Sequence, residues 1–354
     1  MGTLWFCLVA GMIVVYVLLD GFDLGAGAIH LLVAKTDSER RQVLASIGPV
    51  WDGNEVWLLA AAGTLYFAFP ALYASAFSGF YLPLMIVLWL LILRGIAIEF
   101  RNHIKSAVWD PLWDFVFCAS SLLLAIFYGA ALGNVVRGVP LDGTGYFFEP
   151  LWTNWRLGSE TGILDWYTIL VGAVAASALA MHGGLWVSLK TSGAVSQRAA
   201  QLAGRVWWAV AAGILVVSAV TFRVQPQVQE NFKTWRWGFI FPALAIAGAA
   251  GVKFFQARNE ERKAFLSSCG YLAGMLTSMV FGVYPLVLPA RNSLYSLTVS
   301  NAKAGVYGLQ VGLAWWVVGM ILAGGYFTYL YRAFAGKVSL DGDGHGHGSG
   351  HGHL

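Results

Sequence analysis

Long apolar stretches recur along this chain, and each is long enough to cross a lipid bilayer. A transmembrane helix needs about 20 mainly apolar residues. Hydrophobic residues make up 58% of the 354 residues and charged residues 11%, against about 45–50% and 25% in soluble domains. Nine candidate spans lie near residues 3–33, 51–70, 74–99, 112–136, 162–189, 205–222, 237–256, 266–289 and 306–333. The sequence predicts an all-α, polytopic membrane helical bundle with nine transmembrane helices.

The connections between these stretches are polar and hold no second domain. The first stretch lacks a basic segment before it, so we interpret it as a retained helix and not as a cleaved signal peptide. We expect a single nine-helix transmembrane domain over residues 1–336. Residues 337–354 end in DGDGHGHGSGHGHL, a composition typical of a disordered Gly/His-rich tail that could also bind a metal adventitiously.

Lys and Arg are distributed unevenly between the two sides of the predicted bundle. The connections after spans one, three, five and seven, together with the C-terminal end, hold fourteen of the 22. The opposite side holds seven, and Arg94 lies within a span. Because basic residues are enriched in cytoplasmic loops, we predict the C-terminus inside and the N-terminus outside. No basic patch carries interleaved aromatic residues, so no nucleic-acid partner is expected.

Acidic residues at the inner ends of the first two spans are candidates for function. In GPVWDGNEVWLL, Asp52 and Glu55 are three residues apart and share a helix face, with Trp51 one turn from Glu55. An Asp at mid-helix in a membrane costs roughly 2.5–3.5 kcal/mol. Asp20 and Asp23 lie in LLDGFDLGAG, where glycines allow a neighbouring helix to approach closely. These two acids either carry a function or are hydrogen-bonded structural groups.

Arg94 needs an acidic partner from another helix. In LRGIAIEFR, Arg94 and Glu99 are five residues apart and point in different directions on a helix. Asp52 or Glu55 is the economical guess for the partner, and snorkelling of the Arg94 guanidinium to lipid headgroups is the alternative.

The histidines and cysteines show no metal-site spacing. His30, His103 and His182 are the histidines outside the tail, and no two are at i, i+3 or i+4. His182 could ligate a haem iron, but a satisfied packing role is the simpler interpretation. The three cysteines are far apart. No metal site and no catalytic residue of this chain is therefore expected.

The motifs together resemble those of subunit II of the cytochrome bd quinol oxidases, including the cyanide-insensitive branch. The similarity covers nearly the whole chain, and PVWDGNEVWL at 49–58 is its most specific part. The other parts are LLDGFDLGAG at 18–27, the stretch from FSGFYLPL to LRGIAIEFR at 77–101, WDPLWDF at 109–115, and YPLVLPA with SLYSLT at 284–298.

The resemblance implies an enzyme complex of the bacterial cytoplasmic (inner) membrane. It oxidises ubiquinol or menaquinol, reduces dioxygen to water and generates a proton motive force. Haem b and haem d, or b-type haems only, are ligated by subunit I, and this multi-pass chain ligates none. The implied partners are subunit I, quinol and membrane lipid; the sequence leaves open small accessory subunits and a structural quinone.

The resemblance also implies roles for single residues. Trp51 resembles an aromatic residue that contacts a structural quinone, and Asp52, Arg94 and Glu99 resemble positions proposed for a proton path. Glu99 stands where many members have Asp. With Glu55, Asp20 and Asp23 these residues form the candidate path. Two alternatives stay open: a secondary transporter that uses the acids as coupling-ion sites, and a purely structural scaffold subunit.

Overall fold

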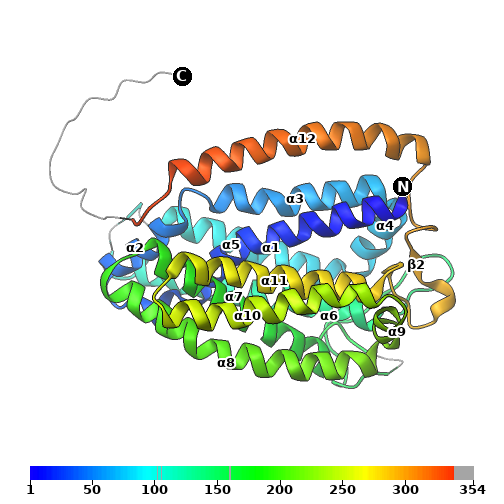
Figure 1. The fold of residues 1–354 in the computed structure, drawn as a ribbon, viewed down its shortest axis with the longest axis horizontal. Helices are drawn as coiled ribbons and strands as arrows, with labels where there is room; N and C mark the ends of the chain where they lie inside the picture. Colours follow the sequence, from blue (N-terminus) through cyan, green and yellow to red (C-terminus); the bar gives the residue numbers. More distant parts are fainter. Residues whose placement is uncertain (102, 105, 159–160, 339–354) are drawn as a thin grey trace.

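Long helices, roughly aligned along one axis, dominate the computed structural model, which describes residues 1–101, 103–104, 106–158 and 161–338 (Figure 1). The long helices are α1 (Gly2–Val33), α3 (Trp51–Ala68), α5 (Tyr81–Phe100), α6 (Trp109–Arg137), α7 (Trp166–Lys190), α8 (Gly193–Val224), α10 (Ile240–Ala257), α11 (Glu261–Val283) and α12 (Val306–Ala333). The short elements are α2 (Asp37–Ile47), α4 (Pro70–Gly79), α9 (Pro226–Thr234), the 3₁₀ turns η1 (Arg236–Phe239) and η2 (Ser293–Tyr295), and the strands β1 (Leu286–Leu288) and β2 (Leu297–Thr298).

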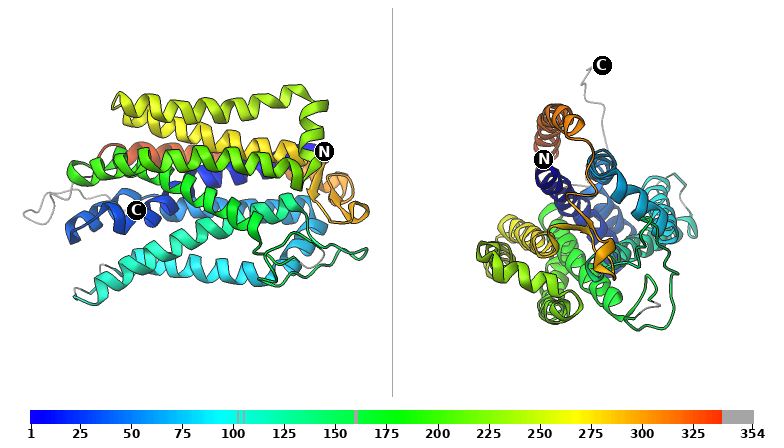
Figure 2. Two further views of the ribbon diagram at one scale, coloured as in Figure 1. Left: turned by 90° about the horizontal axis from the view of Figure 1, so that it is seen from below. Right: turned by 90° about the vertical axis from the view of Figure 1, so that its right-hand side faces the viewer.

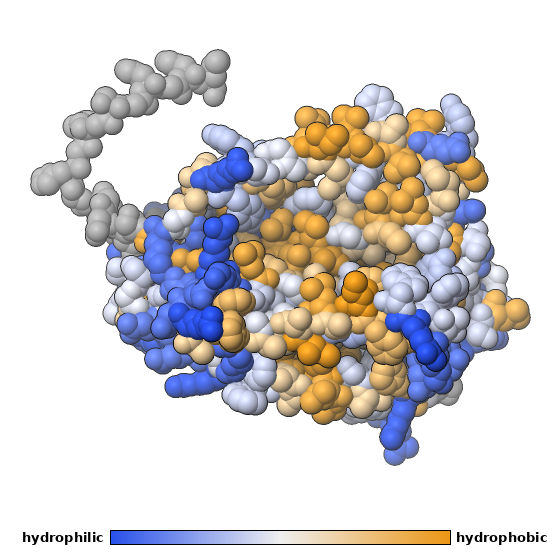
Figure 3. Space-filling view, in the orientation of Figure 1, coloured by the Kyte–Doolittle hydropathy of each residue, from blue (hydrophilic) through white to orange (hydrophobic). Residues whose placement is uncertain are grey.

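Eight helices among the described residues are long and apolar enough to cross a membrane. The helix α3 is not one of them, because Asp52, Asn54 and Glu55 in its first turns lower its hydropathy. On the face shown in Figure 3, apolar side chains gather over the middle of the bundle and hydrophilic ones over its two ends. The prediction of a helical bundle with several membrane-spanning helices is thereby confirmed.

Several helix ends differ from those expected, and each difference has a local cause. Asp165 accepts hydrogen bonds from the backbone N–H groups of Tyr167 (2.7 Å) and Thr168 (3.0 Å), so α7 begins at Trp166 and not near residue 162. The helix α11 ends at Val283, because Pro285 disfavours helical backbone at the residue before it. The antiparallel strands β1 and β2 follow where the sequence predicted helix to residue 289.

The helix α1 lies at the centre of the bundle and packs against α3, α6, α7 and α11. Its closest approach is to α7, at Gly25 and Gly183. A Cβ atom on Gly25 would lie 1.9 Å from the carbonyl oxygen of Leu179, and one on Gly183 would lie 2.2 Å from the carbonyl carbon of Gly25. The expected close approach of a helix to the glycines after Asp20 is therefore confirmed.

The helix α12 lies at the edge of the bundle, beside α1 and α3 (Figures 1 and 2). Its contacts with them include a cluster in which Trp316 and Phe327 pack against Met12 of α1 and Trp57 of α3. At its C-terminal end, Lys337 donates hydrogen bonds to the carbonyl oxygens of Ser188 and Thr191, beyond the predicted domain boundary at 336. The predicted disorder of the tail falls on residues 339–354, outside the described residues.

Gly25→Val tests the helix crossing. The added atoms have no space against the backbone of α7, so we expect much less subunit in membranes and a lower thermal midpoint, since overpacking alone costs about 1–3 kcal/mol. Gly11→Val is the control on the same helix, because no atom lies within 4 Å of a Cβ there. Equal membrane levels of the two variants would contradict the crossing.

Candidate functional site

A buried ion pair joins α1 to α5. The side chains of Asp20 and Arg94 are both fully buried. Nη1 of Arg94 donates to Oδ2 of Asp20 at 2.9 Å, and Nη2 donates to Oδ1. This two-pronged arrangement matches the fork of a guanidinium to the two oxygens of a carboxylate. Asp20 is therefore the main partner of Arg94.

Glu55 is the second acid at this ion pair. Its Oε2 lies 3.8 Å from Nη2 of Arg94, and its side chain is 24% exposed. The expectation that Arg94 pairs with Asp52 or Glu55 is thus wrong for Asp52 and right only in part for Glu55. The sequence could not reveal Asp20 as the partner, because 74 residues separate it from Arg94.

Asp52 and Glu99 lie on the surface of this chain. The carboxylate of Asp52 accepts a hydrogen bond from the backbone N–H of Gly53 at 2.7 Å. Glu99 is exposed near the end of α5. In the described part of the chain neither acid pairs with Arg94, so the structure brings together only Asp20, Glu55 and Arg94 of the predicted charged set.

Asp23 belongs to a second polar contact, one turn along α1 from Asp20. Its Oδ2 accepts a hydrogen bond from Nδ2 of Asn54 at 2.7 Å. Oδ1 of Asn54 accepts in turn from the hydroxyl of Tyr331 on α12 at 2.8 Å. Asn54 is the functional candidate that our sequence interpretation missed. Its position between Asp52 and Glu55 was a signal, because a buried amide at this depth needs polar partners.

Trp51 lies at the start of α3, close to the ion pair. The six-membered part of its ring approaches Gly95, where a Cβ atom would lie 3.5 Å from Cη2. Gly95 follows Arg94 in sequence, and Trp51 is half-buried. The absence of a side chain at Gly95 therefore leaves room for the edge of the indole beside α5.

The histidines inside the bundle have protein partners. Nδ1 of His182 bonds to Oγ of Ser268 (2.7 Å), and its Nε2 bonds to the carbonyl oxygen of Leu18 (3.0 Å). Nε2 of His30 lies 2.8 Å from Oδ1 of Asp114. Within the ranges that the structure describes, no group of three or more His, Cys, Asp or Glu residues could hold a metal ion. Haem ligation by His182 would require the hydrogen bond at the ligating nitrogen to be given up.

Asp114 organises one end of the bundle, and sequence reasoning did not single it out. Its carboxylate is fully buried and accepts from Nε of Arg101 at 2.6 Å and from Nη1 of Arg40 at 3.0 Å. Arg101 also reaches Asp37 at 2.8 Å. With His30, these contacts join α1, α2, the end of α5 and α6. An acid in the apolar run after Trp109 was the available signal.

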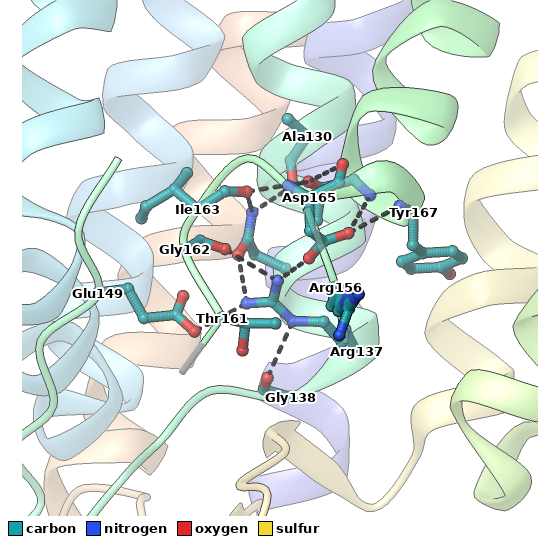
Figure 4. Close-up of polar contacts among 12 residues, drawn as sticks. Ala130, Arg137, Gly138, Glu149, Arg156, Thr161, Gly162, Ile163, Asp165 and Tyr167 are labelled. Carbon is teal, nitrogen blue, oxygen red and sulfur yellow. Dashed lines mark hydrogen bonds and ion pairs between the residues drawn. The ribbon is translucent and has the colours of Figure 1, made fainter. Parts of the chain in front are cut away.

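At the opposite end of the bundle, Arg137 is the last residue of α6 and contacts residues of the long connection before α7 (Figure 4). Its guanidinium points between Glu149 and Asp165, and its Nη2 lies 2.8 Å from Oε1 of Glu149. Nη1 also donates to the carbonyl oxygen of Gly162 at 3.1 Å. Arg291 contacts the same Glu149 oxygen. Burial raises the pKa of Glu149 despite these arginines, so the cluster holds the connection against the helices at a desolvation cost.

Comparison with known proteins identifies the family. A model of the family described as cytochrome bd terminal oxidase subunit II matches residues 1–334. This chain belongs to that family. The resemblance noted from the sequence motifs is thereby confirmed.

Curated relatives cover nearly the same length. The chain is 31% identical to the cytochrome bd ubiquinol oxidase subunit 2 of Bacillus subtilis, over 87% of this chain and 88% of that protein. It is 30% identical to the probable cytochrome oxidase subunit 2 of Haemophilus influenzae, over 96% and 95%. For the cytochrome bd-I ubiquinol oxidase subunit 2 of Escherichia coli K12 the identity is 28%, over 90% and 89%.

The fold agrees with the family. A chain of the bd oxidase from Geobacillus thermodenitrificans superimposes with a TM-score of 0.71, covering 94% of this chain and 98% of that one at 16% identity. The helical arrangement described above is therefore that of a bd oxidase subunit. As a subunit II, this chain is a component of a respiratory oxidase complex.

The Asp20–Arg94 pair can be tested with a double-mutant cycle. Arg94→Gln leaves a buried carboxylate without its cation, so we expect a loss of stability of about 3–5 kcal/mol and little assembled complex. Adding Asp20→Asn removes the unpaired charge and should restore part of the assembly. The control Lys233→Gln changes a cation that is 59% exposed. Additive effects of the two core substitutions, measured as haem-loaded complex and thermal midpoint, would refute the pairing.

Proposed function

We propose that this chain is the non-haem subunit of a complex that oxidises quinol and reduces dioxygen to water. The single observation that carries the proposal is the family match over residues 1–334. The relatives from Bacillus subtilis and Escherichia coli are named as ubiquinol oxidase subunits. These findings favour the oxidase over the secondary transporter. The partner is a haem-bearing subunit I, which holds haem b and haem d, or b-type haems only, and the complex generates a proton motive force.

We further propose nine spans, with the N-terminus outside and the C-terminus inside the bacterial cytoplasmic membrane. The helix α3 is the ninth. Its 18 residues span about 27 Å at 1.5 Å per residue, and its buried residues Trp57 and Ala61 pack against α1 and α12. The end of the bundle that holds α2 also carries Arg40, Arg101 and Lys337. This basic end suits the cytoplasmic side.

In this arrangement the candidate proton path lies in the inner half of the bundle. Asp20, Asp23, Glu55 and Arg94 form its buried part, and Asp52 and Glu99 form its exposed part. Supporting this division, Asp20 and Asp23 are fully buried while Asp52 and Glu99 are open to the surface. Trp51 is the proposed contact of a structural quinone, since its indole lies beside Gly95, the residue that follows Arg94.

The division of labour between the subunits predicts that this chain binds no haem by itself. Expressed without its partner and extracted from membranes, it should show no Soret band, because both nitrogens of His182 are already hydrogen-bonded. A stoichiometric haem that is lost in His182→Ala would contradict the proposal.

The exposed acids test the proton path against the scaffold alternative. We expect Asp52→Asn and Glu99→Gln to assemble with full haem content but to slow oxygen consumption about tenfold or more, because an amide accepts hydrogen bonds without releasing a proton. Turnover per haem in membranes is the measurement.

The control is Glu230→Gln, an exposed acid near the other end of the bundle whose side chain is 61% exposed. It should retain the turnover of the unmodified complex. If Asp52→Asn and Glu99→Gln retain it too, these two acids carry no protons and the chain serves as a scaffold there.

A further inference from the structure

Asp23 differs from the other buried acids in having no ion pair with a cation among the described residues. Its carboxyl group is fully buried. Oδ2 accepts one hydrogen bond from an uncharged amide, Nδ2 of Asn54. Oδ1 is buried and has no hydrogen-bond partner among the described residues. By contrast, both oxygens of Asp20 are bonded to Arg94.

The charges around Asp23 do not balance if every acid is ionised. The titratable and charged groups that face this region are Asp20 on α1, Glu55 on α3, Arg94 on α5, Cys269 on α11 and Tyr331 on α12, with His182 on α7 about one turn away. Arg94 is the cation of this set and is committed to Asp20. A second negative charge at Asp23 would be buried beside the first, which is strongly unfavourable in a low-dielectric interior.

A neutral carboxyl group fits this site better than a carboxylate does, because its proton has a place on Oδ1, the oxygen without a partner among the described residues. A protonated carboxyl group can release its proton to a nearby acceptor, and it can take up another proton if water reaches it. Asp20 cannot do so without first losing its two bonds to Arg94.

A pocket lies at the end of the bundle that holds α2, on the far side of Tyr331 from Asn54 and Asp23. It has a volume of about 320 Å³ and lies between the α2–α3 connection, the end of α7 and the end of α12; its lining includes Ser46, Pro49, Trp186, Lys190, Tyr331 and Ala335. Tyr331 lines this pocket and also donates its hydroxyl hydrogen to Asn54. Two hydrogen bonds thus separate the pocket from Asp23.

We propose that Asp23 is the fully buried member of this chain's proton path that takes up and releases a proton, and that it is loaded from this pocket past Tyr331 and Asn54. The proposal rests on the proposed function, because it names the loading residue and the entrance of that proton path. Asp23 first passes its proton on toward Glu55, the neighbouring acid that is partly exposed, and becomes a carboxylate. A hydronium ion in the pocket then transfers a proton to this carboxylate and leaves a water molecule.

Asn54 and Tyr331 act as positioning residues in this scheme. An amide nitrogen does not readily release its protons, so Asn54 holds Asp23 in place without relaying. The proton must travel on water that enters when the Tyr331 hydroxyl moves aside. Asp20 and Arg94 belong to the buried part of the path as a permanent ion pair and not as proton carriers.

The first test compares isosteric variants in the complete oxidase complex. We expect Asp23→Asn to assemble with normal haem content, because an amide mimics a protonated carboxyl group, and to lower turnover at least tenfold. Glu230→Gln should match the unmodified complex. Turnover of Asp23→Asn equal to that of the unmodified complex, at equal haem content, would overturn the proposal.

The second test blocks the pocket after assembly, so that folding cannot be affected. Ala335→Cys places a thiol on the exposed lining, to be labelled by a membrane-impermeant maleimide in inverted vesicles. We expect labelling to remove most of the turnover. The matched control is Ala257→Cys, exposed in a different pocket near the end of α10. Unmodified complex treated with the same reagent controls for the native cysteines.

A smaller change probes the entrance itself. Tyr331→Phe removes the hydroxyl that bonds Asn54 and should alter the dependence of turnover on pH. Tyr329, on the same helix, is 73% exposed, and Tyr329→Phe should leave the pH dependence of turnover unchanged.

The labelling test has a clear negative outcome. If labelled Ala335→Cys retains full turnover, the pocket is not the entrance for protons.

Failure of this inference is distinguishable from failure of the proposed function. If Asp52→Asn and Glu99→Gln slow the enzyme while Asp23→Asn does not, only the inference is wrong. If the complex that contains this chain oxidises no quinol, the proposed function is wrong.

Discussion

The buried ion pair between Asp20 and Arg94 is the constraint on which the packing of α1 against α5 depends. Each charge is prohibitively costly in an apolar interior by itself, and the two-pronged contact offsets this cost for both. Because Asp20 lies on α1 and Arg94 on α5, the pair fixes how these helices are rotated toward each other. In the part of the chain that the structure describes, Asp23, one turn away, is then bonded to the uncharged amide of Asn54 and to no cation. The different environments of these two acids therefore follow from a single contact.

Ionic clusters at both ends of the bundle extend the same principle. Asp114 gathers Arg40, Arg101 and His30 at the end that holds α2. Arg137 gathers Glu149 and Asp165 at the other end. Between them the core is held by close packing of apolar groups. Gly25 packs against Gly183, and the ring of Phe22 stacks on that of Trp186 with 3.9 Å between the ring centroids. Directional polar contacts thus fix the ends, and shape complementarity fixes the middle.

The sequence anticipated the class of structure and many of the polar positions, but not their pairing. It predicted that Asp20 and Asp23 face a neighbouring helix, and both are fully buried. It pointed Arg94 toward Asp52 or Glu55. Asp20 is the main partner and Glu55 a more distant one, because residues far apart in the chain meet only once the helices are packed. Asn54 was overlooked because an amide carries no charge to signal its burial, although it links Asp23 to Tyr331.

The sequence by itself determined that this is a multi-pass membrane protein of the cytochrome bd subunit II family, since apolar length and local motifs are properties of continuous segments. Local signals such as the Asp165 cap and Pro285 also set helix ends. Only the tertiary structure decided which acid receives the one nearby guanidinium and which is left without a cation. That choice depends on helix rotation and depth, which hydropathy does not encode because many packings bury the same apolar residues.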